Sequence, residues 1–153
     1  MTPIIKWIYL IALAVWTGAI VFFSAVIAPT LHRVLKPEDA ALLTRKLFPK
    51  YYFNAIICAG VGIVCVGLLL SERAFGKWPG VLSLLLLASL GATCFWLRQT
   101  IVPAMEALRE QRAKDPEAEI EWRTMHHTSV RLNVVVLAGL LALLFLLVFS
   151  RVV

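Results

Sequence analysis

Four polar or aromatic side chains near the C-terminal end of the chain share one side of a predicted helix. Trp122, His126, Ser129 and Asn133 are spaced at i, i+4, i+7 and i+11, which places side chains on a single helical face. An imidazole, a hydroxyl and an amide on one face are groups that bind a ligand, accept a proton or contact a substrate. A purely structural role is the alternative, because polar residues in membrane bundles commonly hydrogen-bond to neighbouring helices. Both interpretations predict that this face points into a bundle, since lipid offers polar groups no partners.

The helix that carries this face belongs to a mostly apolar chain. Hydrophobic residues make up 61% of the 153 residues and charged residues 16%. Uncharged stretches of 25, 20, 20 and 19 residues occur at Trp7–Leu31, Tyr51–Leu70, Trp78–Leu97 and Leu132–Ser150. A helix of about 20 apolar residues crosses the hydrocarbon core of a bilayer. The sequence therefore predicts an all-α integral membrane four-helix bundle, a single domain over 1–153 with spans at about 5–31, 51–71, 78–100 and 128–150.

Lysine and arginine are distributed unevenly between the two ends of the predicted bundle. Four spans place both termini and the short turn Ser71–Lys77 on one side. That side carries four of the 15 basic residues, and the two long connections on the other side carry the remaining eleven. By the positive-inside rule, we expect the long connections in the cytoplasm and both termini outside, in the plasma membrane or, in a bacterium, the inner membrane. The pI near 9.6 follows from this topology, and no nucleic-acid partner is expected.

Both long connections are predicted to contain helix. Pro37-Glu38-Asp39 is typical of a helix start. The amphipathic stretch Ala40–Phe48 is expected to form a short helix along the cytoplasmic headgroups, ended by Pro49. Asp115-Pro116 is a second helix start, from which one helix is expected to continue through Trp122 into the fourth span.

Trp16 is a further candidate, because it lies well inside the first span and away from the interfaces. It is expected either to fill the core or to form the wall of an apolar pocket. No acidic residue lies within a span, which argues against a pump with a carboxylate relay. The sequence also contains no P-loop, HExxH motif or Ser-His-Asp order, so we assign no catalytic residues.

Three patches that follow one another along nearly the whole chain are shared with a known family. They are Arg33-Val34-Leu35 with Leu47-Phe48-Pro49-Lys50-Tyr51, Trp96-Leu97 with Ala104-Met105-Glu106-Ala107-Leu108, and His126-x-x-Ser129-x-x-x-Asn133. In these patches the chain resembles the transmembrane-protein-205-like family, small multi-pass proteins described as a domain of unknown function. The resemblance implies a four-helix membrane fold and points to His126, Ser129 and Asn133, but it implies no established activity. His32 departs from the family pattern, in which an apolar aromatic residue is usual.

A looser likeness extends to copper-resistance-type membrane proteins and to the small haem-dependent protoporphyrinogen oxidases. Those proteins are also helical bundles with a first helix rich in tryptophan and glycine and with functional histidines. Fold similarity does not fix function, so this likeness supplies only an alternative to the ligand-binding hypothesis.

Two classes of function therefore remain open. The first is a non-enzymatic small-ligand binding or transport-related module, or an accessory subunit of a homo-oligomer or larger membrane complex. Its candidate ligand contacts are Trp122, His126, Ser129, Asn133 and Trp16. The second is a haem b or copper redox protein with His126 as ligand, because imidazole and soft donors suit those metals. Candidates for a second ligand are His127, His32 and Met125.

Overall fold

The computed structural model describes residues 1–112 and 114–149, with the backbone alone at positions 32 and 37. Helices account for nearly all of these residues. Their order along the chain is α1 (Thr2–Phe22), η1 (Phe23–Ile27), α2 (Ala28–Val34), α3 (Pro37–Ser71), α4 (Lys77–Trp96), η2 (Leu97–Ile101), α5 (Val102–Leu108) and α6 (Pro116–Phe149).

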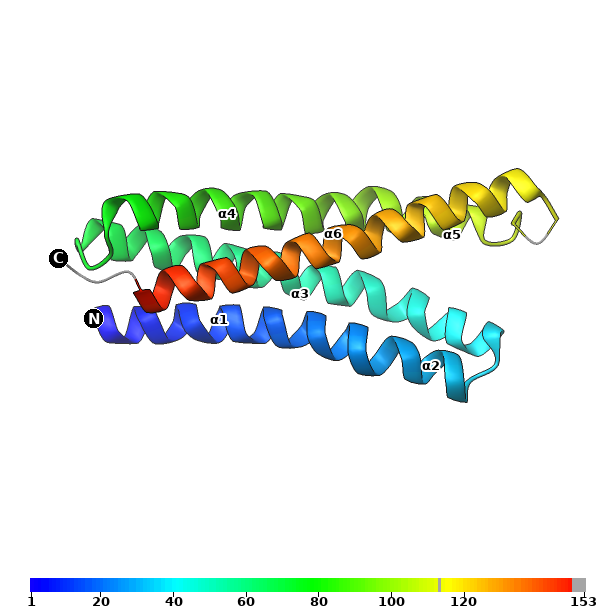
Figure 1. Cartoon of the computed structure of the whole chain (residues 1–153), viewed down its shortest axis with the longest axis horizontal. Coiled ribbons are helices and arrows are strands. Elements are labelled where there is room, and N and C mark those ends of the chain that lie inside the picture. The colour runs from blue at the N-terminus through cyan, green and yellow to red at the C-terminus, as the bar shows by residue number, and fades with distance from the viewer. Residues whose placement is uncertain (113, 150–153) are drawn as a thin grey trace.

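These elements form four long rods that lie side by side (Figure 1). The first rod is α1, η1 and α2, the second is α3, the third is α4, η2 and α5, and the fourth is α6. Each rod contains a helix long and apolar enough to cross a membrane. The all-α, four-helix membrane fold predicted from the uncharged stretches is thus confirmed.

Neighbouring rods run in opposite directions around the bundle. α1 packs against α3 and α6, and α4 packs against the same two helices. The pairs α1 with α4 and α3 with α6 lie diagonally opposite. This is the up-down-up-down arrangement of a four-helix bundle. Its core is filled by fully buried side chains that include Tyr9, Trp16, Tyr52, Leu87 and Leu140.

The segment Ala40–Phe48 is helical, as expected, but it belongs to a longer helix. The prediction of a separate short helix that Pro49 ends is wrong. α3 runs without interruption from Pro37 to Ser71, 35 residues, and Pro49 lies inside it. A proline inside a helix removes one N–H donor and crowds the carbonyl four residues earlier. The helix continues because Phe48 and Tyr51, on either side of Pro49, both pack against Phe23 at ring-centroid distances of 5.1 and 5.2 Å.

The predicted helix start at Asp115-Pro116 is confirmed. The carboxylate of Asp115 accepts a hydrogen bond of 2.9 Å from the backbone N–H of Glu117, which satisfies one of the free donors at a helix N-terminus. α6 then continues for 34 residues to Phe149. The predicted continuity of this segment with the fourth span is therefore confirmed.

Two wide helical turns interrupt the first and third rods. The π-helical segments η1 and η2 end at Ile27 and Ile101, and each is followed two residues later by a proline, Pro29 or Pro103. A proline leaves a carbonyl of the preceding turn without its N–H partner, and a wider turn accommodates this defect. The wide turns therefore separate α2 from α1 in the first rod and α5 from α4 in the third rod.

Close approach of α3 and α4 depends on glycine. A Cβ atom at Gly91 would lie 2.9 Å from the Cβ of Ala59, closer than two carbons approach without a shift of the backbone. We predict that Gly91→Ala forces α3 and α4 apart and lowers the free energy of unfolding by about 1–3 kcal/mol, as overpacking does in other cores. Thermal unfolding in detergent measures this effect.

The matched control for this prediction is Gly60→Ala. A Cβ at Gly60 has no atom within 4 Å, and alanine favours helix over glycine. We expect no loss of stability in this variant. Equal stability of the Gly91→Ala variant and the wild type would contradict the proposed packing.

Candidate functional site: a cavity at the basic end of the bundle

A cavity of about 320 Å³ lies between α3, the η2–α5 segment and α6. Its lining residues are Ala41, Thr44, Arg45, Phe48 and Tyr52 on α3, then Ile101, Val102, Met105, Glu106, Arg109 and Arg112, and finally Trp122, His126 and Ser129 on α6. Helical spacing explains why the α3 residues line the cavity together. The α3 residues fall at i, i+3, i+4, i+7 and i+11, which is one helical face. In the part of the chain that the structure describes, no residue of α1, η1 or α2 lines this cavity.

The structure brings together three of the five residues that the sequence singled out as ligand contacts. Trp122, His126 and Ser129 line the cavity from the same face of α6. Asn133 continues this face one turn deeper. Trp16 is completely buried in the bundle core on α1 and does not line the cavity. The spacing argument therefore identified one wall correctly, and ligand binding at that wall stays a prediction.

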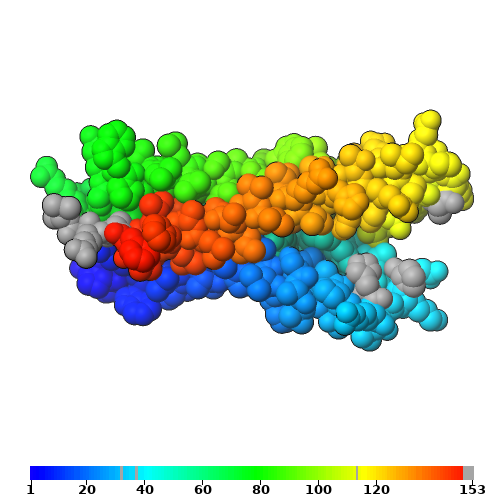
Figure 2. Space-filling model, viewed as in Figure 1, coloured from blue at the N-terminus to red at the C-terminus, as the bar shows by residue number. Residues whose placement is uncertain are grey.

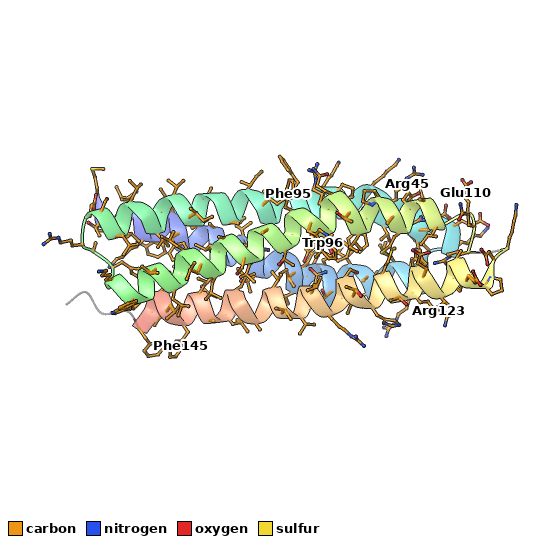
Figure 3. The ribbon with its side chains drawn as sticks, turned by 90° about the horizontal axis from the view of Figure 1, so that it is seen from above. Arg45, Phe95, Trp96, Glu110, Arg123 and Phe145 are labelled. Carbon is orange, nitrogen blue, oxygen red and sulfur yellow. The ribbon has the colours of Figure 1, made fainter. Side chains whose placement is uncertain are left out.

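The cavity is apolar at its deep end and charged at its outer end. Phe48, Tyr52 and Ile101 lie toward the middle of the bundle, whereas Arg45 lies seven residues before Tyr52, roughly 10 Å further along the helix axis. Glu106, Arg109 and Arg112 follow Ile101 in the direction of the same end. Arg45, Glu110 and Arg123 mark this end of the bundle, opposite Phe145 (Figure 3).

One carboxylate connects two of the three guanidinium groups. Oε1 of Glu106 lies 3.1 Å from Nε of Arg45 on α3, and Oε2 lies 3.5 Å from Nε of Arg109. The first of these ion pairs connects α3 to α5 at the outer end of the cavity, and the second joins α5 to the residue that follows it. The lining therefore carries three guanidinium groups against one carboxylate, an excess of positive charge that favours an anion.

The third guanidinium group, that of Arg112, is held in place by stacking on an aromatic ring. The guanidinium carbon of Arg112 lies 4.1 Å from the ring centroid of Trp122. The Trp122 ring in turn stacks on His126, with centroids 5.2 Å apart and ring planes 7° from parallel. Nε of Arg112 is also 3.7 Å from a carboxylate oxygen of Glu119. Cation–π contact and stacking therefore hold Arg112, Trp122 and His126 as one unit at the wall.

The indole N–H of Trp122 is buried and has no acceptor among the described residues. A buried donor without a partner costs free energy, so such groups are usually satisfied by protein, water or ligand. Because Trp122 lines the cavity, an acceptor atom of a bound molecule would remove this cost.

Asn133 forms the junction between the cavity and the apolar core. Its Oδ1 accepts a hydrogen bond of 2.8 Å from the hydroxyl of Tyr51, and its Nδ2 donates to the hydroxyl of Tyr52 at 3.1 Å. Nδ2 also donates to the backbone carbonyl of Ser129 at 3.0 Å. The expectation that Asn133 pairs inside the bundle is confirmed. The expected partner, Thr17 or Ser24 on the first helix, is wrong, because the long tyrosine side chains of α3 reach Asn133 across the bundle.

Several residues that the structure places at this site were not among the ligand contacts predicted from the sequence. They are Tyr51, Tyr52, Arg45, Glu106, Arg109 and Arg112. A one-face spacing from Ala41 to Tyr52 was present in the sequence and would have identified the α3 wall. The arginines and Glu106 could not be assigned to a site without knowing which faces of α3 and α5 meet.

Two candidate second ligands of the metal hypothesis differ in their burial. Met125 is partly buried against the apolar core, and His127 is exposed with its ring centroid 5.9 Å from that of His126. The side chain of His32 lies outside the described residues. Within residues 1–112 and 114–149, no group of three or more His, Cys, Asp and Glu side chains is close enough to hold a metal ion. Met105 lines the same cavity as His126.

The fold and this cavity define a helical membrane protein with a basic, partly apolar chamber at one end of its bundle. The family model for the domain of unknown function DUF4149 matches residues 11–114, about two thirds of the chain, so the protein belongs to that family. The match covers the α3 and η2–α5 walls of the cavity and ends before α6. The expected membership of a family of unknown function is confirmed, whereas the finer resemblance to the transmembrane-protein-205-like family stays a prediction.

A relative supports this assignment over most of the chain. An uncharacterized protein of Aquifex aeolicus (strain VF5) is 33% identical over 135 residues, which cover 85% of this chain and 86% of the relative. No solved structure matches.

The hydrogen bonds of Asn133 predict a stability effect. Replacing Asn133 with leucine removes the partners of Tyr51 and Tyr52 in a region where lipid offers none. We expect Asn133→Leu to lower the free energy of unfolding by about 1 kcal/mol, a typical value for hydrogen bonds in membrane bundles. Thermal unfolding in detergent checks this value.

Asn54→Leu is the control, because it makes the same chemical change on α3 at a residue for which the structure shows no side-chain hydrogen bond. It should leave stability nearly unchanged. An Asn133→Leu variant as stable as this control would show that the tyrosine–asparagine contacts contribute nothing.

Proposed function

We propose that this protein binds a small molecule with an anionic group and an apolar body in the cavity between α3, α5 and α6. The observation that carries the proposal is the composition of the lining. Three guanidinium groups face one carboxylate at the outer end, and aromatic and aliphatic side chains form the deep end. Ligand sites are typically apolar cavities of about 300–1,000 Å³ with a few convergent polar groups.

The contacts at the two ends of the cavity support binding over passage through the bundle. The hydrogen bonds between Tyr51, Tyr52 and Asn133 close the deep end. A bound molecule is therefore retained between this floor and the charged outer end, as in a binding module or an accessory subunit. The resemblance of His126, Ser129 and Asn133 to the pattern of the transmembrane-protein-205-like family adds support, because His126 and Ser129 line the cavity and Asn133 forms part of its floor.

A cavity-filling variant tests the proposal. Ala41 lines the cavity, so Ala41→Trp should occupy its volume and exclude a ligand. We expect native mass spectrometry of the gently purified wild type to show a bound small molecule that is missing from this variant. Ala88→Trp, on the exposed surface of α4, should retain it. Empty wild-type protein, or equal occupancy of the two variants, would contradict a ligand site here.

Haem b or copper at His126 is the second candidate, favoured by the fact that His126 and Met105 line the same cavity. A thioether and an imidazole are ligands of copper and of haem iron. The preparations described above separate the two candidates. A Soret band or stoichiometric copper that is lost in His126→Ala would support the metal, whereas a colourless, copper-free protein with an organic molecule bound supports the anionic ligand.

We further propose that the chain crosses the plasma membrane four times with the cavity end in the cytoplasm. The distribution of four against eleven lysines and arginines supports this orientation. Cysteine labelling tests it with little background, because Cys58, Cys65 and Cys94 are buried. In intact cells, an impermeant reagent should modify a cysteine appended after Val153 and should not modify Glu117→Cys. Labelling of Glu117→Cys from outside would reverse the proposed topology.

A further inference from the structure

The proposed site can be specified further, on the assumption that the cavity binds an anionic molecule. We infer that its occupant is an anionic phospholipid of the adjacent leaflet, with its phosphate held by Arg45, Arg109 and Arg112 and its glycerol and upper chains against Phe48, Ile101 and Val102. Four features of the structure support this inference: charge, an unsatisfied donor, membrane level and an opening toward the bilayer.

The guanidinium groups leave donors available for several oxygens. Arg45 and Arg109 share the single carboxylate of Glu106, at 3.1 and 3.5 Å. Arg112 approaches Glu119 only to 3.7 Å. Guanidinium groups bind phosphate with paired N–H donors. A phosphate also supplies an acceptor for the buried indole N–H of Trp122, which has none among the described residues.

The Arg45 guanidinium at the outer end of the cavity lies at headgroup level. The uncharged part of α3 begins after Lys50 and that of the third rod ends before Arg98, so these two residues mark the boundary of the hydrocarbon. Arg45 precedes Lys50 by five residues, about 8 Å along the helix. The headgroup layer on each side of a bilayer is roughly 5–8 Å thick. The phosphate of a lipid in this leaflet is therefore at the level of the Arg45 guanidinium.

The bundle is open toward the bilayer at this level. α1 contacts both α3 and α6, but α2, its continuation, contacts α3 and no longer reaches α6. Figure 1 shows α2 diverging from α6 toward this end, and Figure 2 shows the surface recessed between them. The π-helical segment η1 and Pro29 lie where the divergence begins. A soluble anion requires neither a lateral opening nor the apolar deep end of the cavity, whereas a lipid uses both.

Lipid titration of the full-length protein tests this inference. Native mass spectrometry is used to compare retention of phosphatidylglycerol and of phosphatidylcholine with the same acyl chains. We expect one tightly retained phosphatidylglycerol and at least about tenfold weaker retention of phosphatidylcholine. Arg45→Gln and Arg112→Gln should each weaken phosphatidylglycerol retention by about tenfold. Arg131→Gln, an exposed residue of α6 outside the cavity, removes the same charge and should have no such effect.

Two results would overturn the lipid assignment while leaving the binding function intact. One is equal retention of both lipids, with the Ala41→Trp-sensitive molecule being something else. The other is displacement of phosphatidylglycerol by millimolar inorganic phosphate or glycerol phosphate, which would make the ligand a soluble anion. Weakening by Arg131→Gln as strong as that by Arg112→Gln would also overturn it, because it would reduce the effect to surface charge.

Discussion

The structure depends on the inability of lipid to form hydrogen bonds. Backbone groups within a bilayer must be satisfied inside the protein, and for this chain the solution is four long helices. The same constraint governs the exceptions. Where Pro29 and Pro103 remove an N–H, the chain makes a wider helical turn and does not unwind. The polar side chain of Asn133 is turned inward and finds its partners on α3.

The hydrogen bonds of Asn133 divide the interior into two regions with different chemistry. Toward one end, the bundle is filled by apolar side chains around Trp16 and Leu140. Toward the other, helices that extend beyond the uncharged stretches carry arginines and Glu106 around a cavity. The Tyr51 and Tyr52 hydroxyls reach Asn133 across the diagonal of the bundle and so connect helices whose backbones do not touch. This junction pairs the polar atoms of Tyr51, Tyr52 and Asn133 at the point where a charged chamber adjoins an apolar core.

One side of the cavity lacks a helix because the four rods do not stay together along their full length. α1 is packed between α3 and α6, but after η1 its continuation α2 leaves α6. The other three rods remain in contact through α5, with Glu106 bridging Arg45 and Arg109. Three packed rods surround the chamber and the departing fourth leaves a side without a wall. A defect in helical geometry near Pro29 therefore lies where the fourth wall of the chamber is lost.

The sequence by itself determined the features that depend on local spacing and on charge. Uncharged stretches specified the four helices, Asp115-Pro116 specified the start of α6, and the helical period placed Trp122, His126 and Ser129 on one face. Only the tertiary structure decided which surfaces meet. Pro49 did not end its helix, and the residues on either side of it pack against Phe23 of the first rod. The partner of Asn133 and the grouping of Arg45 with Glu106 depend on the register between helices more than 50 residues apart in the chain, and no local pattern encodes that register.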